Sequence, residues 1–343
     1  MQAIRIADRE ARLDRLGAGL LLAAVAWTFL SATIAGGRPG PVALILVATG
    51  VAFAAGRILG LTDERFVPAV ISGICVLLVA IYLRHSVKGA IAGPLHYTNA
   101  SAALYLQGVI AALVLTTILR PGAGRNAAAS AAAILGCAVL IADSRATDAL
   151  LVLPVIAWFL RDRVAVRTGL KVFAGLLVGA LLLTVALGAT APAGVRHDRN
   201  LGPVGEELSG NRLALWSDAL TLMREYPLSG VGPGRFQFAS PTARSDTDLR
   251  WAHNGFLQQG AEQGLVGLAL AITLFLWVFV RLWSLPAPDR TCALAGAAVA
   301  VLGIQACADY LLHFPALTVA AAALAGSVIS SRSLRWPAGV TKR

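Results

Sequence analysis

Apolar and polar positions separate into long blocks along this chain. Runs of Leu, Ala, Val and Gly alternate with short polar segments over most of the sequence. An α-helix needs roughly 20 apolar residues to cross a bilayer, whereas a β-barrel would show short alternating strands. The pattern predicts an all-α, polytopic integral membrane protein with about ten transmembrane helices, at residues 16–35, 41–61, 66–83, 101–119, 127–142, 147–160, 172–192, 264–283, 291–308 and 314–330.

One segment outside the apolar runs stands out by its length. Residues 193–255 hold seven arginines and seven acidic residues, so the segment is neutral and is not a basic tail. Within it, residues 211–226 are expected to form a helix that Pro227 ends, and a second helix is expected to start near His253 and continue into the eighth span. The chain therefore divides into transmembrane helices 1–7 in residues 1–192, an extracytoplasmic loop with short helices in residues 193–255, and transmembrane helices 8–10 with a cytoplasmic tail in residues 256–343.

Composition and charge support this assignment. Hydrophobic residues make up 57% of the chain and charged residues 14%, against roughly 25% charged residues in an average soluble domain. The net charge of +11 does not require a nucleic-acid partner, because no basic run is interleaved with aromatic residues. Of the 29 Lys and Arg residues, 18 fall in segments on the side of the N-terminus and only four in the short loops opposite. The positive-inside rule therefore predicts an inner-membrane protein with both termini in the cytoplasm and the long loop outside.

Two arginines near the outer face are candidates for binding an anion. Arg145 adjoins a short apolar run, where a charge needs a partner or water, so it either pairs with Asp143 or Asp148 or faces a cavity as an anion site. Arg212 lies in the first turn of a predicted helix, which is the unfavourable end of the helix dipole for a cation. It is either a solvated surface arginine or a group that holds a phosphate beside free backbone N–H groups.

His253 is the candidate for proton transfer. A lone histidine usually has a structural role, but this one is expected at a helix N-terminus where the chain re-enters the membrane. The positive end of the helix dipole disfavours an imidazolium, so a neutral ring there is able to accept a proton.

Other polar residues carry weaker signals. Asp309 and His313 are four residues apart and are expected to be interfacial or paired with each other. Glu262 is expected to face a cavity near the eighth span. The four cysteines lie in apolar runs without metal-ligand spacing and are expected to be buried thiols. His85, His96 and Tyr97 share one loop but do not make a zinc site. The sequence predicts neither a metal site nor a cofactor.

Three motifs in the second half of the chain resemble the signature of the bacterial O-antigen ligase and polymerase superfamily. They read NRLALWSDA at 211–219, YPLSGVGPGRF at 226–236 and AHNGFLQQGAEQGLVG at 252–267. Three shorter segments add to the resemblance, namely GPLHYTNA at 93–100, DSR at 143–145 and DYLLHFPA at 309–316.

The resemblance implies a function and assigns roles. Enzymes of this superfamily move a glycan from an undecaprenyl-diphosphate donor to an acceptor hydroxyl on the outer face of the inner membrane, without a metal and with inversion. By this resemblance, Arg145 and Arg212 hold the diphosphate and His253 is the general base. Trp216, Asn254 and Glu262 are the further residues assigned to the substrate site, and the partners are the lipid-linked glycan donor, a glycan or lipid acceptor and membrane lipids.

The chemistry implied by the resemblance is consistent with these side chains. Undecaprenyl diphosphate is a leaving group of concentrated negative charge, which two arginines can neutralise as it departs. A neutral histidine can take the proton of an acceptor hydroxyl.

Other functions remain open on the sequence alone. A polymerase of lipid-linked repeat units would share the same site chemistry and differ in its acceptor. A transporter or flippase of lipid-linked glycan would place polar residues near mid-membrane and show two similar halves, and a scaffold would bind the glycan without reacting.

Overall fold

The computed structural model describes residues 2–85, 93–191, 210–245 and 249–333, and the chain within these ranges forms helices without strands. This confirms the predicted all-α class. The long helices are α1 (Gln2–Ala35), α2 (Pro39–Thr62), α3 (Phe66–His85), α4 (Thr98–Ile118), α5 (Ala123–Ile141), α8 (Arg163–Thr190), α13 (Gly255–Trp283), α14 (Arg290–Ala308) and α15 (Pro315–Ser333). The shorter helices are α6 (Arg145–Leu150), α7 (Val152–Phe159), α10 (Gly210–Glu225), α11 (Phe236–Ala239), α12 (Pro241–Ser245) and the 3₁₀ turn η2 (Leu311–His313).

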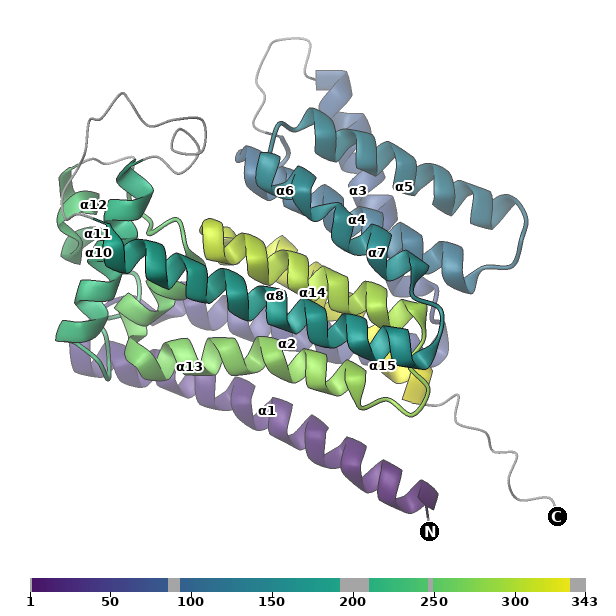
Figure 1. The fold of residues 1–343 in the computed structure, drawn as a ribbon, viewed down its shortest axis with the longest axis horizontal. Helices are drawn as coiled ribbons and strands as arrows, with labels where there is room; N and C mark the ends of the chain where they lie inside the picture. Colours follow the sequence, from purple (N-terminus) through teal and green to yellow (C-terminus); the bar gives the residue numbers. More distant parts are fainter. Residues whose placement is uncertain (1, 86–92, 192–209, 246–248, 334–343) are drawn as a thin grey trace.

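The helices form an antiparallel bundle (Figure 1). Nine helices among the described residues are long and apolar enough to cross a membrane. The predicted sixth span is the pair α6 and α7, which runs in one direction and is broken at Leu151. With this pair the described helices pass along the bundle ten times, so the start of α1 and the end of α15 lie at the same end.

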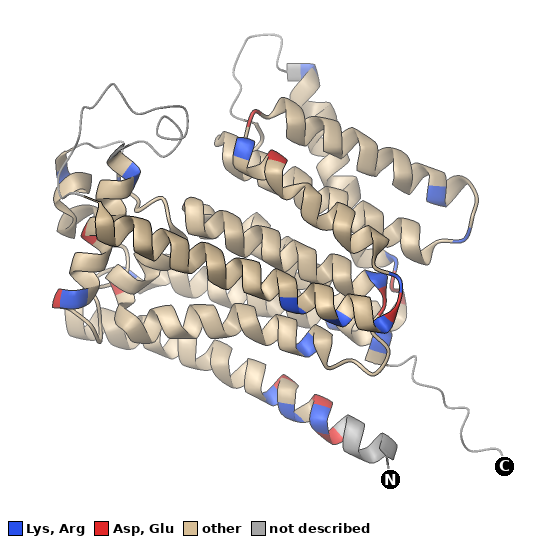
Figure 2. Cartoon of the chain, viewed as in Figure 1, with Lys and Arg blue, Asp and Glu red and all other residues tan. Residues whose placement is uncertain are grey.

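Charge is distributed unequally between the two ends of the bundle. Figure 2 shows Lys and Arg gathered at the end where α1 starts and α15 finishes. Two of these arginines are buried and paired there: Arg281 contacts Asp14 at 2.8 Å, and Arg332 contacts Asp289 at 2.8 Å. We call this the terminal end, and the opposite end, where α10 to α12 lie, the loop end.

Small residues let helices of the bundle approach closely. Gly56 and Gly60 of α2 lie directly against the backbone of α15, and Gly326 of α15 lies against the backbone of α2. Packing through small residues is the usual basis of helix association in a bilayer, where apolar burial gives no driving force between helices. Of the four cysteines, three are buried as expected and Cys137 is exposed on α5.

The helix α13 starts nine residues before the predicted span and contains a sharp kink. Gly264 has a φ of 69° and a ψ of −174°, a backbone region that only glycine occupies without strain. Such a kink frees carbonyl groups from the helix ladder, and in a membrane each freed group needs another partner.

The partners of these carbonyls come from two other parts of the chain. The backbone N–H of Val231 donates to Ala261 and that of Gly232 donates to Glu262, at 2.9 and 2.8 Å. The indole of Trp27 in α1 donates to the carbonyl of Gln263 at 2.8 Å. The kink therefore explains why segment 229–235 is rich in glycine: its backbone must approach α13 closely enough to donate these hydrogen bonds.

We expect Gly264→Ala to destabilise the fold. A Cβ at this position would overlap the Leu228 carbonyl oxygen, and the backbone strain alone would cost roughly 1–3 kcal/mol. Thermal unfolding of the purified protein in detergent would measure the loss. Gly179→Ala in α8 is the matched control, since a Cβ there meets no other atom within 4 Å, and it should be neutral or slightly stabilising. Equal stability of the two variants would contradict the role given to the kink.

Candidate active site

His253 lies at the loop end, directly before α13. Asn254 is the N-cap of this helix, and its side-chain oxygen accepts hydrogen bonds from the backbone N–H groups of Phe256 and Leu257 at 3.1 and 2.9 Å. His253 itself has a φ of 48°, in the left-handed region. Asn254 thus fixes the start of the helix, and the backbone turn before it sets the direction of the histidine ring.

The ring of His253 is paired with a buried carboxylate. Its Nδ1 lies 3.1 Å from Oδ1 of Asp309, whose side chain is 5% exposed. Asp309 follows the last residue of α14, and its backbone carbonyl also accepts the N–H of Gly255 at 3.2 Å. Two ends of helices that are distant in sequence are therefore joined at this pair. One alternative from the sequence was that Asp309 pairs with His313. In the structure it pairs with His253 instead.

Asp309 is held in place by further donors. Its Oδ2 accepts hydrogen bonds from the hydroxyl of Tyr97 and, at 2.7 Å, from the amide of Asn99 at the start of α4. Its Oδ1 also accepts the backbone N–H of Tyr310 at 2.8 Å. Burial would raise the pKa of Asp309, but the hydrogen bonds from His253, Tyr97 and Asn99 outweigh it and hold the pKa below its usual value.

The ionised carboxylate determines which nitrogen of His253 carries a proton. An acceptor at 3.1 Å from Nδ1 favours the tautomer with the proton on Nδ1. The other nitrogen, Nε2, has no hydrogen-bond partner among the described residues and is then a proton acceptor. This arrangement, a histidine oriented by a buried carboxylate, is suited to general base chemistry.

Arg212 lies close to this pair. It occupies the first turn of α10, and its guanidinium donates to the carbonyl of Ala308, the residue before Asp309, at 3.3 Å. Burial and the negative charge of Asp309 raise the pKa of Tyr97, and the positive charge of Arg212 opposes that rise. The structure therefore brings Arg212 to the same cluster as Asp309 and Tyr97.

Arg145 starts α6 at the same end of the bundle. It is exposed, and Ser144 precedes it as the N-cap residue. The helix is tied to α14 by Gln305, whose amide donates to the hydroxyl of Thr147 at 2.8 Å. Gln305 lies one turn before Ala308, so α6 and Arg212 are anchored to the same last turn of α14.

Trp216 and Glu262 have mainly structural contacts. Trp216 is buried and donates its indole N–H to the carbonyl of His253 at 3.4 Å, which positions the residue before Asn254. Glu262 is also buried, and its carboxylate accepts the backbone N–H groups of Gly234 and Phe236 at 2.8 and 3.2 Å. Glu262 therefore fastens the glycine-rich segment onto α13.

Tyr97 and Asn99 were not among the candidate residues from the sequence, and Asp309 was only a weak one. Tyr97 and Asn99 lie at the start of α4, more than 200 positions before Asp309, which itself follows α14 56 positions after His253. A signal was present, since both segments belong to the short motifs at 93–100 and 309–316. Their contact with His253, however, follows only from the packing of α4 and α14.

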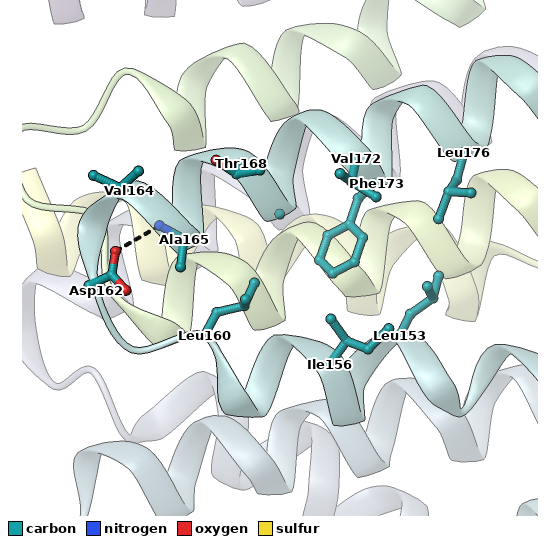
Figure 3. Close-up of a pocket in the computed structure, with 11 residues that line it drawn as sticks. Leu153, Ile156, Leu160, Asp162, Val164, Ala165, Thr168, Val172, Phe173 and Leu176 are labelled. Atoms are coloured by element: carbon teal, nitrogen blue, oxygen red, sulfur yellow. Dashed lines mark hydrogen bonds between the residues drawn. The ribbon is translucent and has the colours of Figure 1, made fainter.

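An apolar groove lies away from these residues. Figure 3 shows it between α7 and α8 near the terminal end of the bundle, with a volume of about 480 Å³. Apolar side chains line most of it, and the carboxylate of Asp162 at its edge accepts the backbone N–H of Ala165 at 2.8 Å as the N-cap of α8. Without converging polar groups this groove offers no site for the chemistry considered above.

Comparison with known families gives one match. Residues 130–272 match the family model described as O-antigen ligase. The range runs from α5 into α13 and includes Arg145, Arg212 and His253, whereas Tyr97 and Asp309 lie outside it. No curated protein matches the chain.

Proposed function

The O-antigen ligase domain at residues 130–272 supports membership of the O-antigen ligase superfamily, and from this premise we propose that the chain transfers a glycan from an undecaprenyl-diphosphate donor to an acceptor hydroxyl. The family match and the long apolar helices support a multi-pass inner-membrane protein with a glycosyltransferase-like function in polysaccharide biosynthesis. The pairing of His253 with Asp309 beside Arg212 is the observation that best supports glycan transfer from a diphosphate-linked donor.

The reaction assigns a task to each of these groups. Nε2 of His253 takes the proton of the acceptor hydroxyl while the oxygen of that hydroxyl forms a bond to the anomeric carbon of the donor sugar. The bond from that carbon to the diphosphate breaks, with inversion, and the diphosphate leaves with the bonding electrons. Arg212 and Arg145 neutralise the negative charge that develops on it, as charge-assisted donors of fixed geometry.

The same two arginines are proposed to make a metal unnecessary. Two guanidinium groups supply positive charge where a bound cation would otherwise stand against the diphosphate. Transfer should therefore persist in the presence of EDTA, and a loss of transfer that added Mg²⁺ restores would contradict this part of the proposal.

A polymerase is the second candidate, because it would use the same donor and the same base. Mass spectrometry of glycans from a strain lacking this protein separates the two. Loss of every attached glycan is the result expected for a ligase. Retention of a single attached repeat with loss of the long chains would identify a polymerase instead.

The first test of the donor site is Arg212. We expect Arg212→Ala to lose about 2–3 kcal/mol of transition-state stabilisation, or roughly 30- to 150-fold in transfer. Arg212→Lys should lose most of this as well, since lysine keeps the charge but not the fork that matches phosphate oxygens. Arg224→Ala, in the last turn of the same helix, is the matched control and should keep its activity. Full activity of Arg212→Ala would remove the diphosphate role.

We propose that the loop end faces outward. The 18 basic residues in segments on the side of the N-terminus indicate that the terminal end is cytoplasmic. An impermeant maleimide applied to intact spheroplasts tests the orientation. In a variant without Cys137, an added Ser245→Cys at the loop end should be labelled, and Ala11→Cys at the terminal end should be labelled only after the membrane is opened. Both positions are exposed. The reverse pattern would place the site in the cytoplasm and contradict the proposal.

A further inference from the structure

We propose that Trp251, Tyr310 and His313 form a platform that binds a sugar ring beside His253. We call these three residues the aromatic platform. The inference rests on the proposed function, since it names the subsite that holds one of the two glycans during transfer.

The rings of the platform lie against one another and against the proposed base. The centroids of Trp251 and His313 are 4.2 Å apart, and those of Trp251 and Tyr310 are 6.0 Å apart with the rings inclined by 22°. The ring of His253 meets Tyr310 edge to face, at 5.0 Å and 84°. A ligand on this surface would therefore lie next to the imidazole.

Two rings of the platform, Trp251 and Tyr310, lie outside the packed interior. Tyr97 stacks against Tyr310, Phe314 lies beside Tyr310 with the rings inclined by 34°, and both Tyr97 and Phe314 pack against the apolar core of the bundle. Trp251 and Tyr310 belong to neither apolar core of the described residues, and both rings are only partly buried. Aromatic rings that are ordered by their neighbours but left partly exposed are typical of binding surfaces.

His313 serves this surface as a fixed, neutral ring. Its Nδ1 lies 3.1 Å from the carbonyl oxygen of Tyr310, and its Nε2 lies 3.5 Å from the amide nitrogen of Gln258. A carbonyl oxygen only accepts hydrogen bonds and an amide NH₂ group only donates them, so Nδ1 of His313 donates and Nε2 accepts. Burial lowers the pKa of His313, which agrees with a neutral ring. Both nitrogens are engaged, so the ring acts by its face and not as a second base.

A sugar ring fits this arrangement better than a lipid tail. A pyranose has an apolar face of C–H bonds that packs on the electron-rich face of an aromatic ring, and hydroxyls around its rim that need polar neighbours. His253 supplies such a group against Tyr310. Arg212 supplies another, since its guanidinium donates to the carbonyl of Ala308, two residues before Tyr310 in the chain. The ring could belong to the donor glycan or to the acceptor glycan, and the experiment separates these two sources.

Binding to the purified protein in lipid nanodiscs tests the platform without requiring turnover. Three probes are used: undecaprenyl diphosphate without sugar, the same lipid carrying its glycan, and the free acceptor glycan. Trp251→Ala should weaken binding of one glycan probe by roughly tenfold or more and leave the bare lipid unchanged. Trp251→Phe should recover part of the affinity. Tyr226→Ala, which removes an exposed aromatic ring at the loop end, is the control and should change nothing.

The outcomes separate the platform from the transfer reaction. Weaker binding of the glycan-bearing lipid alone assigns the platform to the donor, and weaker binding of the free glycan assigns it to the acceptor. Either result supports the platform even if no transfer is ever detected. Unchanged binding of both glycan probes in Trp251→Ala would overturn it. Equal weakening of the bare lipid would also overturn it, because the rings would then hold the prenyl tail.

Discussion

Replacement of His253 by alanine should reduce transfer by about two to four orders of magnitude while donor binding stays nearly unchanged. The reason is that Nε2 is the proposed proton acceptor, whereas the donor is held by the arginines. His253→Gln should not restore transfer, since an amide hydrogen-bonds but does not take up a proton. Single-turnover transfer together with equilibrium binding of the lipid-linked donor measures the two effects separately.

A structural role for His253 makes a different prediction. A histidine that only braces the loop would lower stability or expression in both variants and leave the rate of the folded protein unchanged. His96→Asn is the matched control, because His96 is exposed near the same end and also has a positive φ, of 54°. It should transfer at the wild-type rate. Substantial transfer by folded His253→Gln would move the base to another residue.

The second large effect is expected at Asp309. Asp309→Asn should lower transfer by roughly 10²- to 10⁴-fold, as expected when a base loses the carboxylate that fixes its tautomer. With its oxygen toward His253, the asparagine would turn its NH₂ group against the donors Tyr97 and Asn99. With the amide flipped, the NH₂ group would face Nδ1 of His253 and favour the tautomer whose Nε2 is already protonated.

Asp309 acts through His253 and is therefore a positioning residue. Its variant should lower the rate constant of single-turnover transfer and leave the KM for the donor nearly unchanged, whereas a loss of folded protein would lower only the amplitude of that transfer. Asp63→Asn, at an exposed carboxylate of the terminal end, is the control and should have no effect. A full rate in Asp309→Asn would show that the hydrogen bond to His253 is dispensable.

The sequence predicted the bundle well because the signal for a membrane span is carried within each segment. The length of each apolar run is visible in the sequence itself. Among the described residues, nine of the ten predicted spans correspond to helices long and apolar enough to cross a membrane, and the sixth is the broken pair of α6 and α7. Boundaries were less accurate where a helix continues beyond its apolar part, as in α8, which starts at Arg163 while the predicted span starts at residue 172. The start of α13 agrees with the prediction: a helix was expected to start near His253 and continue into the eighth span, and α13 begins at Gly255 with Asn254 as its N-cap.

The candidate site was predicted only in part, because the sequence shows local signals and not the contacts between distant helices. Local cues place His253 before a helix and Arg212 in a first turn, and the structure has both there. The carboxylate that pairs with His253 carries no local cue, because it is brought there by α14 from 56 positions away. The four-residue spacing of Asp309 and His313 suggested a helical pair, but the chain leaves the helix at Ala308 and the 3₁₀ turn directs His313 elsewhere.

Glu262 was assigned to the substrate site from the sequence, but its contacts in the structure are with the backbone of the protein. A buried acid near a span suggested a substrate contact, but its oxygens are bonded to the backbone of the glycine-rich segment. The need for those bonds arises from the kink at Gly264, which periodicity does not reveal because the apolar pattern continues across it. Motif residues at this end of the bundle thus divide between those that shape the loop and those that face Asp309.

Transfer by the purified chain in proteoliposomes tests the central claim most directly. The vesicles would hold undecaprenyl diphosphate carrying a radiolabelled glycan, together with a membrane fraction that supplies the acceptor. We predict that the label becomes covalently attached to the acceptor with the wild-type protein and not with His253→Ala. Label that crosses the bilayer without joining an acceptor, or that stays bound to the protein on its lipid, would contradict the claim and identify a transporter or a scaffold.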